Sequence, residues 1–268
     1  MQARLQEILN KTKKDLTRRK QKTPVEVLKK SLLKTQARSF INAIDPSLRS
    51  GTVAIIAEIK LASPTQTHLG NAKDLILRVK HYEQAGADCI SIVTEKHFFK
   101  GNPTFVKRVK QVISLPILQK DFIIDSYQLY EAKKDGADAL LLIAKILSQK
   151  TLVSLVSLAK KINLEPVVEV NSEDDLKKAI LTKTQIIAVN ARDLDTFIVN
   201  IDRACNLLKK IPNKFIKLGF SGVLGKDEAE KYKISGANGI LIGTSLMRAK
   251  NIQNFLLSLR ATERSVAI

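Results

Sequence analysis

The sequence has few of the features that mark secreted or membrane-spanning proteins. Only two of its 268 residues are cysteine, Cys89 and Cys205, and they form no Cys-x-x-Cys pair, which excludes a framework stapled by disulfides. No apolar run approaches the roughly eighteen residues of a membrane span. The first residues are amphipathic and rich in lysine, where a signal peptide would have an apolar core. We therefore expect a soluble, cytoplasmic protein with no membrane partner.

Patterns that bind metals are also missing. The three histidines show neither the spacing of metal ligands nor a pairing with the cysteines. Asp121 and Asp125 are acidic neighbours, but Asp125 directly precedes a helical stretch at residues 126–134 and fits its N-cap position. We expect no metal site.

Negative charge is scarce beside positive charge. The chain has 45 Lys and Arg against 26 Asp and Glu, a formal net charge of +19, and its first fifty residues hold 13 basic residues and 4 acidic ones. Clustered basic residues are typical of nucleic-acid binders, which release counterions from phosphates. No recognition-helix, zinc-finger or RNP-like aromatic pattern accompanies them here. We interpret the charge as a solvated surface that steers an anionic metabolite towards the protein, with no nucleic-acid partner.

Eight short apolar runs alternate with amphipathic helical stretches from residue 53 onward. The runs are residues 53–60, 89–94, 115–122, 139–145, 166–170, 186–190, 215–221 and 239–243. Short, mostly apolar runs are typical of strands that are buried on both faces of a parallel sheet. The alternation allows a doubly wound sheet or a closed barrel, and eight units favour closure. We predict an α/β protein with a (β/α)₈ TIM barrel.

Glycines mark the joints of this repeating unit. Gly86, Gly136 and Gly236 each stand in a Gly-Ala-Asp or Gly-Ala-Asn string just before an apolar run. Glycine readily takes the left-handed conformation that ends a helix. We therefore expect a helix to end at each of these residues.

The first fifty residues differ from the rest. Residues 4–14 and 25–38 have helical periodicity, and Pro24 suits an early position in the second helix. No linker rich in Gly, Ser or Pro interrupts residues 53–263. We predict two parts, an N-terminal helical extension at residues 1–50 that packs on the barrel and a catalytic barrel at residues 51–268.

Polar residues at the ends of the apolar runs are candidates for an active site, because barrels of this class build their sites from the carboxyl ends of strands. The candidates at or just after a run are Glu58, Lys60, Glu95, Lys120, Glu169, Asn190 and Ser221. Glu58 and Lys60 lie two residues apart and so point to the same side of their strand. The alternative for any one of them is a strand-end ion pair. Two lysines and two glutamates on apolar runs favour a catalytic site, since isolated buried charges are costly.

Glycines in the last two units suggest a phosphate site. Ser221-Gly222 follows the seventh run, and Gly243-Thr244 follows the eighth. Loops at these two positions of a barrel often bind phosphate through backbone N–H groups. Glycines that serve only tight turns are the alternative interpretation.

Several strings together resemble the indole-3-glycerol-phosphate synthase family along nearly the whole chain. The most specific are Ile-Ala-Glu-Ile-Lys-Leu-Ala-Ser-Pro at residues 56–64 and Leu-Gln-Lys-Asp-Phe-Ile-Ile-Asp-Ser-Tyr-Gln at residues 118–128. Val-Glu-Val at residues 168–170, Val-Asn-Ala-Arg-Asp-Leu-Asp-Thr-Phe at 189–197 and Leu-Ile-Gly-Thr-Ser-Leu-Met at 241–247 also match. The resemblance implies conversion of 1-(2-carboxyphenylamino)-1-deoxyribulose 5-phosphate to indole-3-glycerol phosphate, CO₂ and water in tryptophan biosynthesis. It implies no redox cofactor, and other enzymes of that pathway as possible partners.

The resemblance also implies roles for the candidate residues. Lys120 would protonate or polarise the substrate carbonyl, with Glu169 beside it. Lys60 would be a general acid and Glu58 a general base in the dehydration. The remaining substrate-binding candidates are Asn190 for orientation, Ser63, Gly222, Gly243 and Thr244 for the phosphate, and Glu95, Arg192 and Ser221 in the pocket wall. Nearby cations would lower the pKa of a catalytic lysine and carboxylates would raise it, and the sequence does not say which influence is larger.

One departure from the family pattern bears on rate. Phe220 stands where the family usually has glutamate, and Thr65 and Asn102 stand where it commonly has serine. Loss of a carboxylate contact predicts a slower or more weakly binding enzyme. Substitution of Phe220 by glutamate should then raise kcat/KM, unless the neighbours have packed around the ring.

Two other functions are alternatives for this sequence. Another phosphate-binding barrel, such as a phosphoribosylanthranilate isomerase or a relative of the tryptophan synthase α-subunit, leaves the Glu-x-Lys and Lys-Asp-Phe strings unexplained. A barrel that has lost catalysis and become a basic scaffold fits Phe220 and the charge. Retention of all four charged candidates argues against it.

Overall fold

A closed barrel of eight parallel strands forms the centre of the molecule, in a computed structural model that describes residues 3–32, 37–48 and 52–260. The strands pair in chain order, and β8 closes on β1. They are β1 (Ala54–Ile59), β2 (Cys89–Val93), β3 (Ile117–Lys120), β4 (Ala139–Ile143), β5 (Glu165–Val170), β6 (Ile186–Asn190), β7 (Ile216–Phe220) and β8 (Gly239–Ile242). Each predicted run overlaps one strand. The predicted (β/α)₈ barrel is therefore confirmed.

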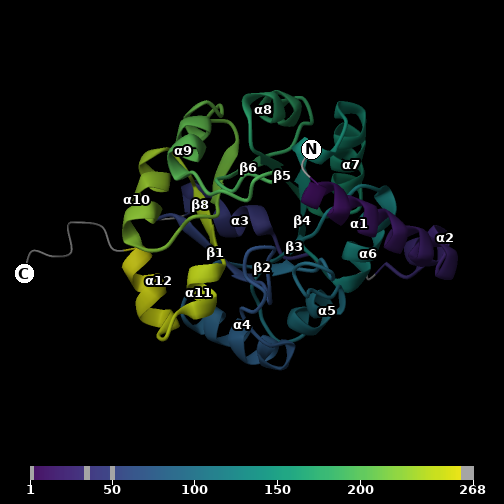
Figure 1. Cartoon of the computed structure of the whole chain (residues 1–268), viewed down its shortest axis with the longest axis horizontal. Coiled ribbons are helices and arrows are strands. Elements are labelled where there is room, and N and C mark those ends of the chain that lie inside the picture. The colour runs from purple at the N-terminus through teal and green to yellow at the C-terminus, as the bar shows by residue number, and fades with distance from the viewer. Residues whose placement is uncertain (1–2, 33–36, 49–51, 261–268) are drawn as a thin grey trace, which may run out of the picture.

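Helices surround the strands as an outer ring (Figure 1). They are α4 (Leu75–Gln84), α5 (Thr104–Lys110), α6 (Ser126–Asp135), α7 (Gln149–Lys161), α8 (Glu173–Ile180), α9 (Ile201–Lys209), α10 (Lys226–Ile234), α11 (Thr244–Arg248) and α12 (Ile252–Arg260). Helix α7 shows how the ring packs, since it buries an apolar stripe of Leu152, Leu155, Val156 and Ala159 on the side of β4 and β5. Nowhere in the described part of the chain is a helix both long and apolar enough to cross a membrane.

The local signals at helix ends behave as the sequence predicted. The Asp125 carboxylate accepts a hydrogen bond from the backbone N–H of Tyr127 at 2.8 Å and so caps α6. Gly86, Gly136 and Gly236 have φ angles of 87°, 92° and 88°. A side chain at any of these positions would be strained, so glycine allows the chain to leave each helix and enter the next strand.

Three helices precede the barrel. Helix α1 (Ala3–Lys22) is longer than its predicted range, and α2 (Val25–Lys30) ends earlier than predicted, with Pro24 as its N-cap. Part of the predicted second helix, residues 33–36, lies outside the described residues. Figure 1 shows α1 and α2 running beside α6. Apolar residues of α1 pack in one cluster with residues inside the barrel.

Helix α3 (Phe40–Ile44) was not predicted. It covers the amino-terminal end of the strands, where Phe40 and Ile44 are fully buried in a cluster with Ala54 and Ile186 at strand starts. Glu165 accepts a hydrogen bond from the backbone N–H of Ile41 at 2.6 Å and holds α3 in place. The predicted boundary between residues 50 and 51 lies outside the described residues, so the division into two parts stays a prediction.

The strand register places four inward-facing side chains at one level. An eight-stranded barrel with a shear of about eight advances by about one residue per strand, and each interior layer takes four side chains from alternate strands. Starting from Glu58 on β1, the observed register leads to Lys120 on β3, Glu169 on β5 and Phe220 on β7, then back to Glu58. We call these four residues the upper layer.

Candidate active site

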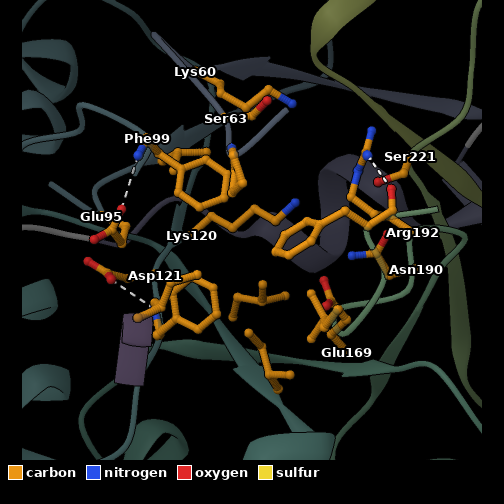
Figure 2. Close-up of a pocket in the computed structure, with 18 of the residues that line it drawn as sticks. Lys60, Ser63, Glu95, Phe99, Lys120, Asp121, Glu169, Asn190, Arg192 and Ser221 are labelled. Atoms are coloured by element: carbon orange, nitrogen blue, oxygen red, sulfur yellow. Dashed lines mark hydrogen bonds between the residues drawn. The ribbon is translucent and has the colours of Figure 1, made fainter. Parts of the chain in front are cut away.

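A pocket lies above the upper layer, at the carboxyl ends of the strands. It contains all five residues predicted to be catalytic, which come from four strands and the residue after β1: Glu58, Lys60, Lys120, Glu169 and Asn190. Figure 2 shows Lys120 extending across the middle of the pocket, with Lys60 and Ser63 on one side and Glu169 and Asn190 on the other. The fold therefore assembles these residues from positions more than a hundred residues apart in the chain.

The Glu58 carboxylate joins the two lysines. Lys60 Nζ lies 2.9 Å from Glu58 Oε1, and Lys120 Nζ lies 3.1 Å from Glu58 Oε2. Burial by itself would raise the pKa of Glu58, whose residue is 2% exposed, but the charges of Lys120 and Lys60 outweigh burial and lower this pKa to about 2. Glu58 is therefore ionised at neutral pH and weakly basic while both lysines hold it.

Lys120 keeps its proton in this environment. Burial acts to lower its pKa, but the carboxylates of Glu58 and Glu169 outweigh burial and raise the pKa above its usual value. The carboxylates therefore have the larger influence on the pKa of Lys120, which the sequence alone could not show. The Lys120 ammonium is charged at neutral pH and can donate hydrogen bonds or a proton.

The pKa of Glu169 is shifted in the opposite direction from the pKa of Glu58. Burial raises its pKa, while Lys120 and a hydrogen bond with the Asn190 side chain only partly counteract this. Its Oε2 atom is buried and has no hydrogen-bond partner among the described residues. Asn190 Oδ1 also accepts a hydrogen bond from the backbone N–H of Arg192 at 3.0 Å, which orients its side chain. A buried carboxyl with an unused oxygen is a group that a substrate can address.

Phe220 completes the upper layer but does not face the pocket. Its side chain is fully buried, and it is not among the residues that line the cavities described here. Lys120 Nζ lies over the ring, 5.1 Å from its centroid. The neighbours have therefore packed around the ring.

A second cavity adjoins the first and holds three of the four predicted phosphate ligands, Gly222, Gly243 and Thr244. The two cavities share Glu58, Lys60, Arg192 and Ser221. Gly222 has a φ of 85°, so its backbone takes a conformation that favours glycine. The fourth predicted ligand, Ser63, lies in the first cavity.

Gly243 leaves space for the Glu58 carboxylate as well as for a substrate phosphate. A Cβ atom at this position would collide with Glu58 Oε1 and lie 3.1 Å from Lys60 Nζ. The end of β8 therefore approaches the charged cluster so closely that only glycine leaves room for the Glu58 carboxylate.

Glu95 lines the pocket, but its oxygens serve the backbone. Its carboxylate accepts hydrogen bonds from the N–H groups of His97, Phe98 and Phe99 at 2.9, 2.7 and 3.0 Å. This arrangement shapes the loop after β2 and leaves little capacity for a ligand. The geometry supports a structural role for Glu95, and its contact with substrate stays a prediction.

Some residues at the two cavities were not predicted from the sequence, and three of them come from helices outside the eight strands. Leu5 and Ile8 of α1 line the first cavity, and Arg248 of α11 lines the second. Arg248 follows Thr244 by four residues, and this spacing places both side chains on one face of a helix. The spacing could have identified Arg248 as a further candidate for the phosphate site. No sequence pattern indicates that α1 reaches over the mouth of the barrel.

The fold and the cavities define a class of protein. A closed barrel with charged acid–base groups at the carboxyl ends of its strands and a glycine-lined cavity beside them is an enzyme of the (β/α)₈ type. Comparison with known proteins narrows the class. A family model described as indole-3-glycerol phosphate synthase matches residues 5–259.

Curated relatives agree with the family model. An indole-3-glycerol phosphate synthase from Caldanaerobacter subterraneus subsp. tengcongensis is 40% identical over 244 residues, covering 91% of this chain and 93% of that protein. Another from Aliarcobacter butzleri is 37% identical over 259 residues, covering 96% of this chain and 98% of that protein. The chain belongs to the indole-3-glycerol phosphate synthase family, an enzyme family that acts on a small phosphorylated substrate.

Solved structures support the fold. A crystal structure of 3-hexulose-6-phosphate synthase superposes with a TM-score of 0.62 at 14% sequence identity, covering 78% of this chain and 98% of that one. At this level of identity the likeness concerns the barrel alone.

Proposed function

We propose that this chain, as an indole-3-glycerol phosphate synthase, uses the upper layer and Lys60 to close and aromatise the indole ring. The substrate is 1-(2-carboxyphenylamino)-1-deoxyribulose 5-phosphate, and the products are indole-3-glycerol phosphate, CO₂ and water. The observation that carries the assignment of residues is the bridge from the Glu58 carboxylate to both lysine ammonium groups, at 2.9 and 3.1 Å inside the pocket. Two proton donors and one acceptor there match a reaction that protonates a carbonyl and later expels water.

Lys120 acts in ring closure. When the aromatic carbon attacks the ketone, the ketone oxygen gains negative charge and takes a proton or a hydrogen bond from the Lys120 ammonium. The raised pKa of Lys120 keeps this group charged at the start of the step. Glu169 lies in the same layer, and its charge stabilises that ammonium. Asn190 holds the Glu169 side chain and orients the substrate.

Lys60 and Glu58 act after CO₂ has left. Lys60 protonates the departing hydroxyl group so that it leaves as water, and Glu58 takes the proton that restores the aromatic ring. With a pKa of about 2, Glu58 is a poor base while both lysines contact it. Donation of a lysine proton to the substrate removes one of these positive charges and raises the basicity of Glu58 at the moment when it is needed.

The substrate phosphate occupies the second cavity. Gly222, Gly243 and Thr244 line it, and Arg248 adds a positive charge. Ser221 and Arg192 lie where the two cavities meet, which suits a substrate with its reacting carbons over Lys120 and its phosphate over the glycines. Ser63 approaches the substrate from the loop after β1, in the first cavity.

Two lysine substitutions test this assignment against a purely structural ion pair. In Lys120→Met, Glu58 keeps its contact with Lys60, so we expect turnover to fall by about 10²–10⁴ with little change in melting temperature. The matched control is Lys110→Met. Lys110 Nζ lies 2.5 Å from the buried Asp138 carboxylate, outside the cavities, so the control should lower the melting temperature and leave kcat unchanged. Retained turnover in Lys120→Met, together with a large loss of stability, would contradict the proposal.

We further propose that the chain works in the cytoplasm and associates with other enzymes of the tryptophan pathway. A cytoplasmic location fits Cys89 and Cys205, which are both buried and form no disulfide with each other. Association with other enzymes of the tryptophan pathway would be measured by co-purification with those enzymes at native concentrations. Migration of the chain as a separate species would contradict that part.

A further inference from the structure

The upper layer has one member without charge. Glu58, Lys120 and Glu169 occupy three of its four positions, and Phe220 occupies the fourth, on the strand opposite Lys120. Lys120 Nζ lies 5.1 Å from the centre of the Phe220 ring. The lysine therefore reaches across the barrel axis and ends above an aromatic face.

This contact differs in kind from the contact with Glu58. The face of an aromatic ring attracts a cation through its quadrupole, and the attraction strengthens as water is excluded. Here the ring is fully buried and the Lys120 side chain is 19% exposed, so water is largely excluded from the pair. A ring has no basic atom that could take the lysine proton. Among the described residues, Lys120 donates a hydrogen bond to the Glu58 carboxylate. The ring adds no second acceptor, so it does not compete with a substrate oxygen for the lysine proton.

The ring is also well placed to fix the lysine chain. Phe220 is fully buried in the cluster that fills the barrel, together with Leu118, Leu218 and Leu241. Its side chain has no space to move away from Lys120, because a close-packed interior holds side chains in one arrangement. The ring is thus a rigid support beneath a flexible four-carbon chain.

We propose that Phe220 is a positioning residue for Lys120, holding its ammonium group over the aromatic face at the pocket centre while leaving the proton available to the substrate. The proposal rests on the proposed role of Lys120 in ring closure. It assigns a function to the position at which this chain departs from the usual family glutamate. Here an aromatic face secures the lysine.

Three variants separate positioning from packing. Phe220→Met keeps an apolar side chain of similar bulk and removes the aromatic face, whereas Phe220→Tyr keeps the face. Phe40→Met makes the same exchange at another fully buried phenylalanine of the same cluster, in α3 at the far end of the barrel. Each is measured for kcat, KM and melting temperature with the full chain.

We expect Phe220→Met to lower kcat by about two- to thirty-fold with KM little changed. Phe220→Tyr should retain most of kcat, and Phe40→Met should lower only the melting temperature. Equal kcat in Phe220→Met and the unaltered chain would overturn the proposal. So would losses in the Met and Tyr variants that simply follow their melting temperatures.

A spectroscopic measurement tests the contact without any turnover. In protein labelled with ¹³C at lysine Cε, the Lys120 signal is identified by its absence in Lys120→Met. The ring should shift the attached protons upfield in the unaltered chain and in Phe220→Tyr, but not in Phe220→Met. The Lys120 signal should also begin to titrate about half to one and a half pH units lower in Phe220→Met. An unshifted signal would refute the contact even if the enzyme is active, whereas a shifted signal in an inactive chain would refute only the proposed function.

Discussion

The two ends of the barrel hold buried charge in different ways. At the amino-terminal end, Asp138 accepts hydrogen bonds from the N–H groups of Arg38 and Ile117 and pairs with Lys110, so both of its oxygens have partners. At the carboxyl end, Glu169 has a buried oxygen without a partner among the described residues, and Glu58 is shared by two lysines. Complete satisfaction favours stability, whereas incomplete satisfaction leaves groups for a substrate.

The apolar residues are enclosed at the amino-terminal end of the barrel and line an open pocket at the carboxyl end. Helix α3 closes the amino-terminal end with Phe40 and Ile44, both fully buried. At the other end Leu5 and Ile8 of α1 line an open pocket. The closed end therefore supplies stability that the reactive end does not, and substitutions at the two ends should affect different measurable quantities.

The largest effect on stability should come from the closed end. Phe40→Ala removes a fully buried ring and leaves a cavity, which costs about 3–5 kcal/mol of unfolding free energy. Because Phe40 lies far from the pocket residues in the fold, kcat per folded molecule should not change. Denaturant unfolding and a turnover assay on the same preparation check both parts. A fall in kcat as large as the fall in stability would break the distinction between the two ends.

Phe220→Glu should have the next largest effect, on catalysis. A carboxylate at this enclosed position would have the Lys120 ammonium close by, since Lys120 Nζ lies 5.1 Å from the centre of the present ring. It would take a charged hydrogen bond from the lysine that the substrate needs, which is worth about 1.5–3 kcal/mol or about ten- to a hundred-fold in rate. We expect kcat/KM to fall by that factor, which is the outcome predicted for neighbours packed around the ring. A gain in kcat/KM would show that the site accommodates the usual family glutamate.

A smaller loss is expected from Gly243→Ala. The added Cβ would displace the Glu58 carboxylate and crowd Lys60, so kcat should fall by about tenfold, the effect of about 1.4 kcal/mol. Gly225→Ala is the matched control, since nothing lies within 4 Å of a Cβ there and its φ of −169° suits any residue. Equal activity in the two variants would remove Gly243 from the charged cluster.

The last expected effect is a change of stability with acid, and it concerns the reactive end alone. The folded pKa of Glu58, about 2, lies below its ordinary value of 4.5. The ionised group therefore contributes stability that is fully present above pH 4.5 and is lost as the pH falls towards 2. Glu58→Gln lacks this contribution. The difference in melting temperature between the unaltered chain and the variant should shrink over this interval, by about 2–4 °C per kcal/mol, and a constant difference would contradict the pKa.

Much of this contrast could be predicted from the sequence, because local patterns report local structure. The eight strands follow from short apolar runs, and the chain ends each run with the polar residues that meet in the pocket. Parallel strands bring their carboxyl ends to one rim, so Glu58, Lys120 and Glu169 could be grouped before their distances were known. The joints at Gly86, Gly136 and Gly236 followed from the conformational freedom of glycine.

The features that could not be predicted from the sequence depend on contacts between segments that lie far apart in the chain. Helix α3 has five residues, too few for a periodic pattern, and its burial depends on the open end of the barrel. The use of Glu95 by three backbone N–H groups follows from the path of one loop. The placement of Phe220 beneath Lys120 depends on the stagger of all eight strands, which no single run encodes.

The charged groups at the carboxyl end of the barrel should, above all, perform chemistry. The most direct test is the indole fluorescence formed when the purified full chain is mixed with 1-(2-carboxyphenylamino)-1-deoxyribulose 5-phosphate over a range of pH and salt. We predict product with the unaltered chain and only background with Lys120→Met at equal concentrations of folded protein. Fluorescence no higher than that of the substrate alone, under every condition, would contradict the account.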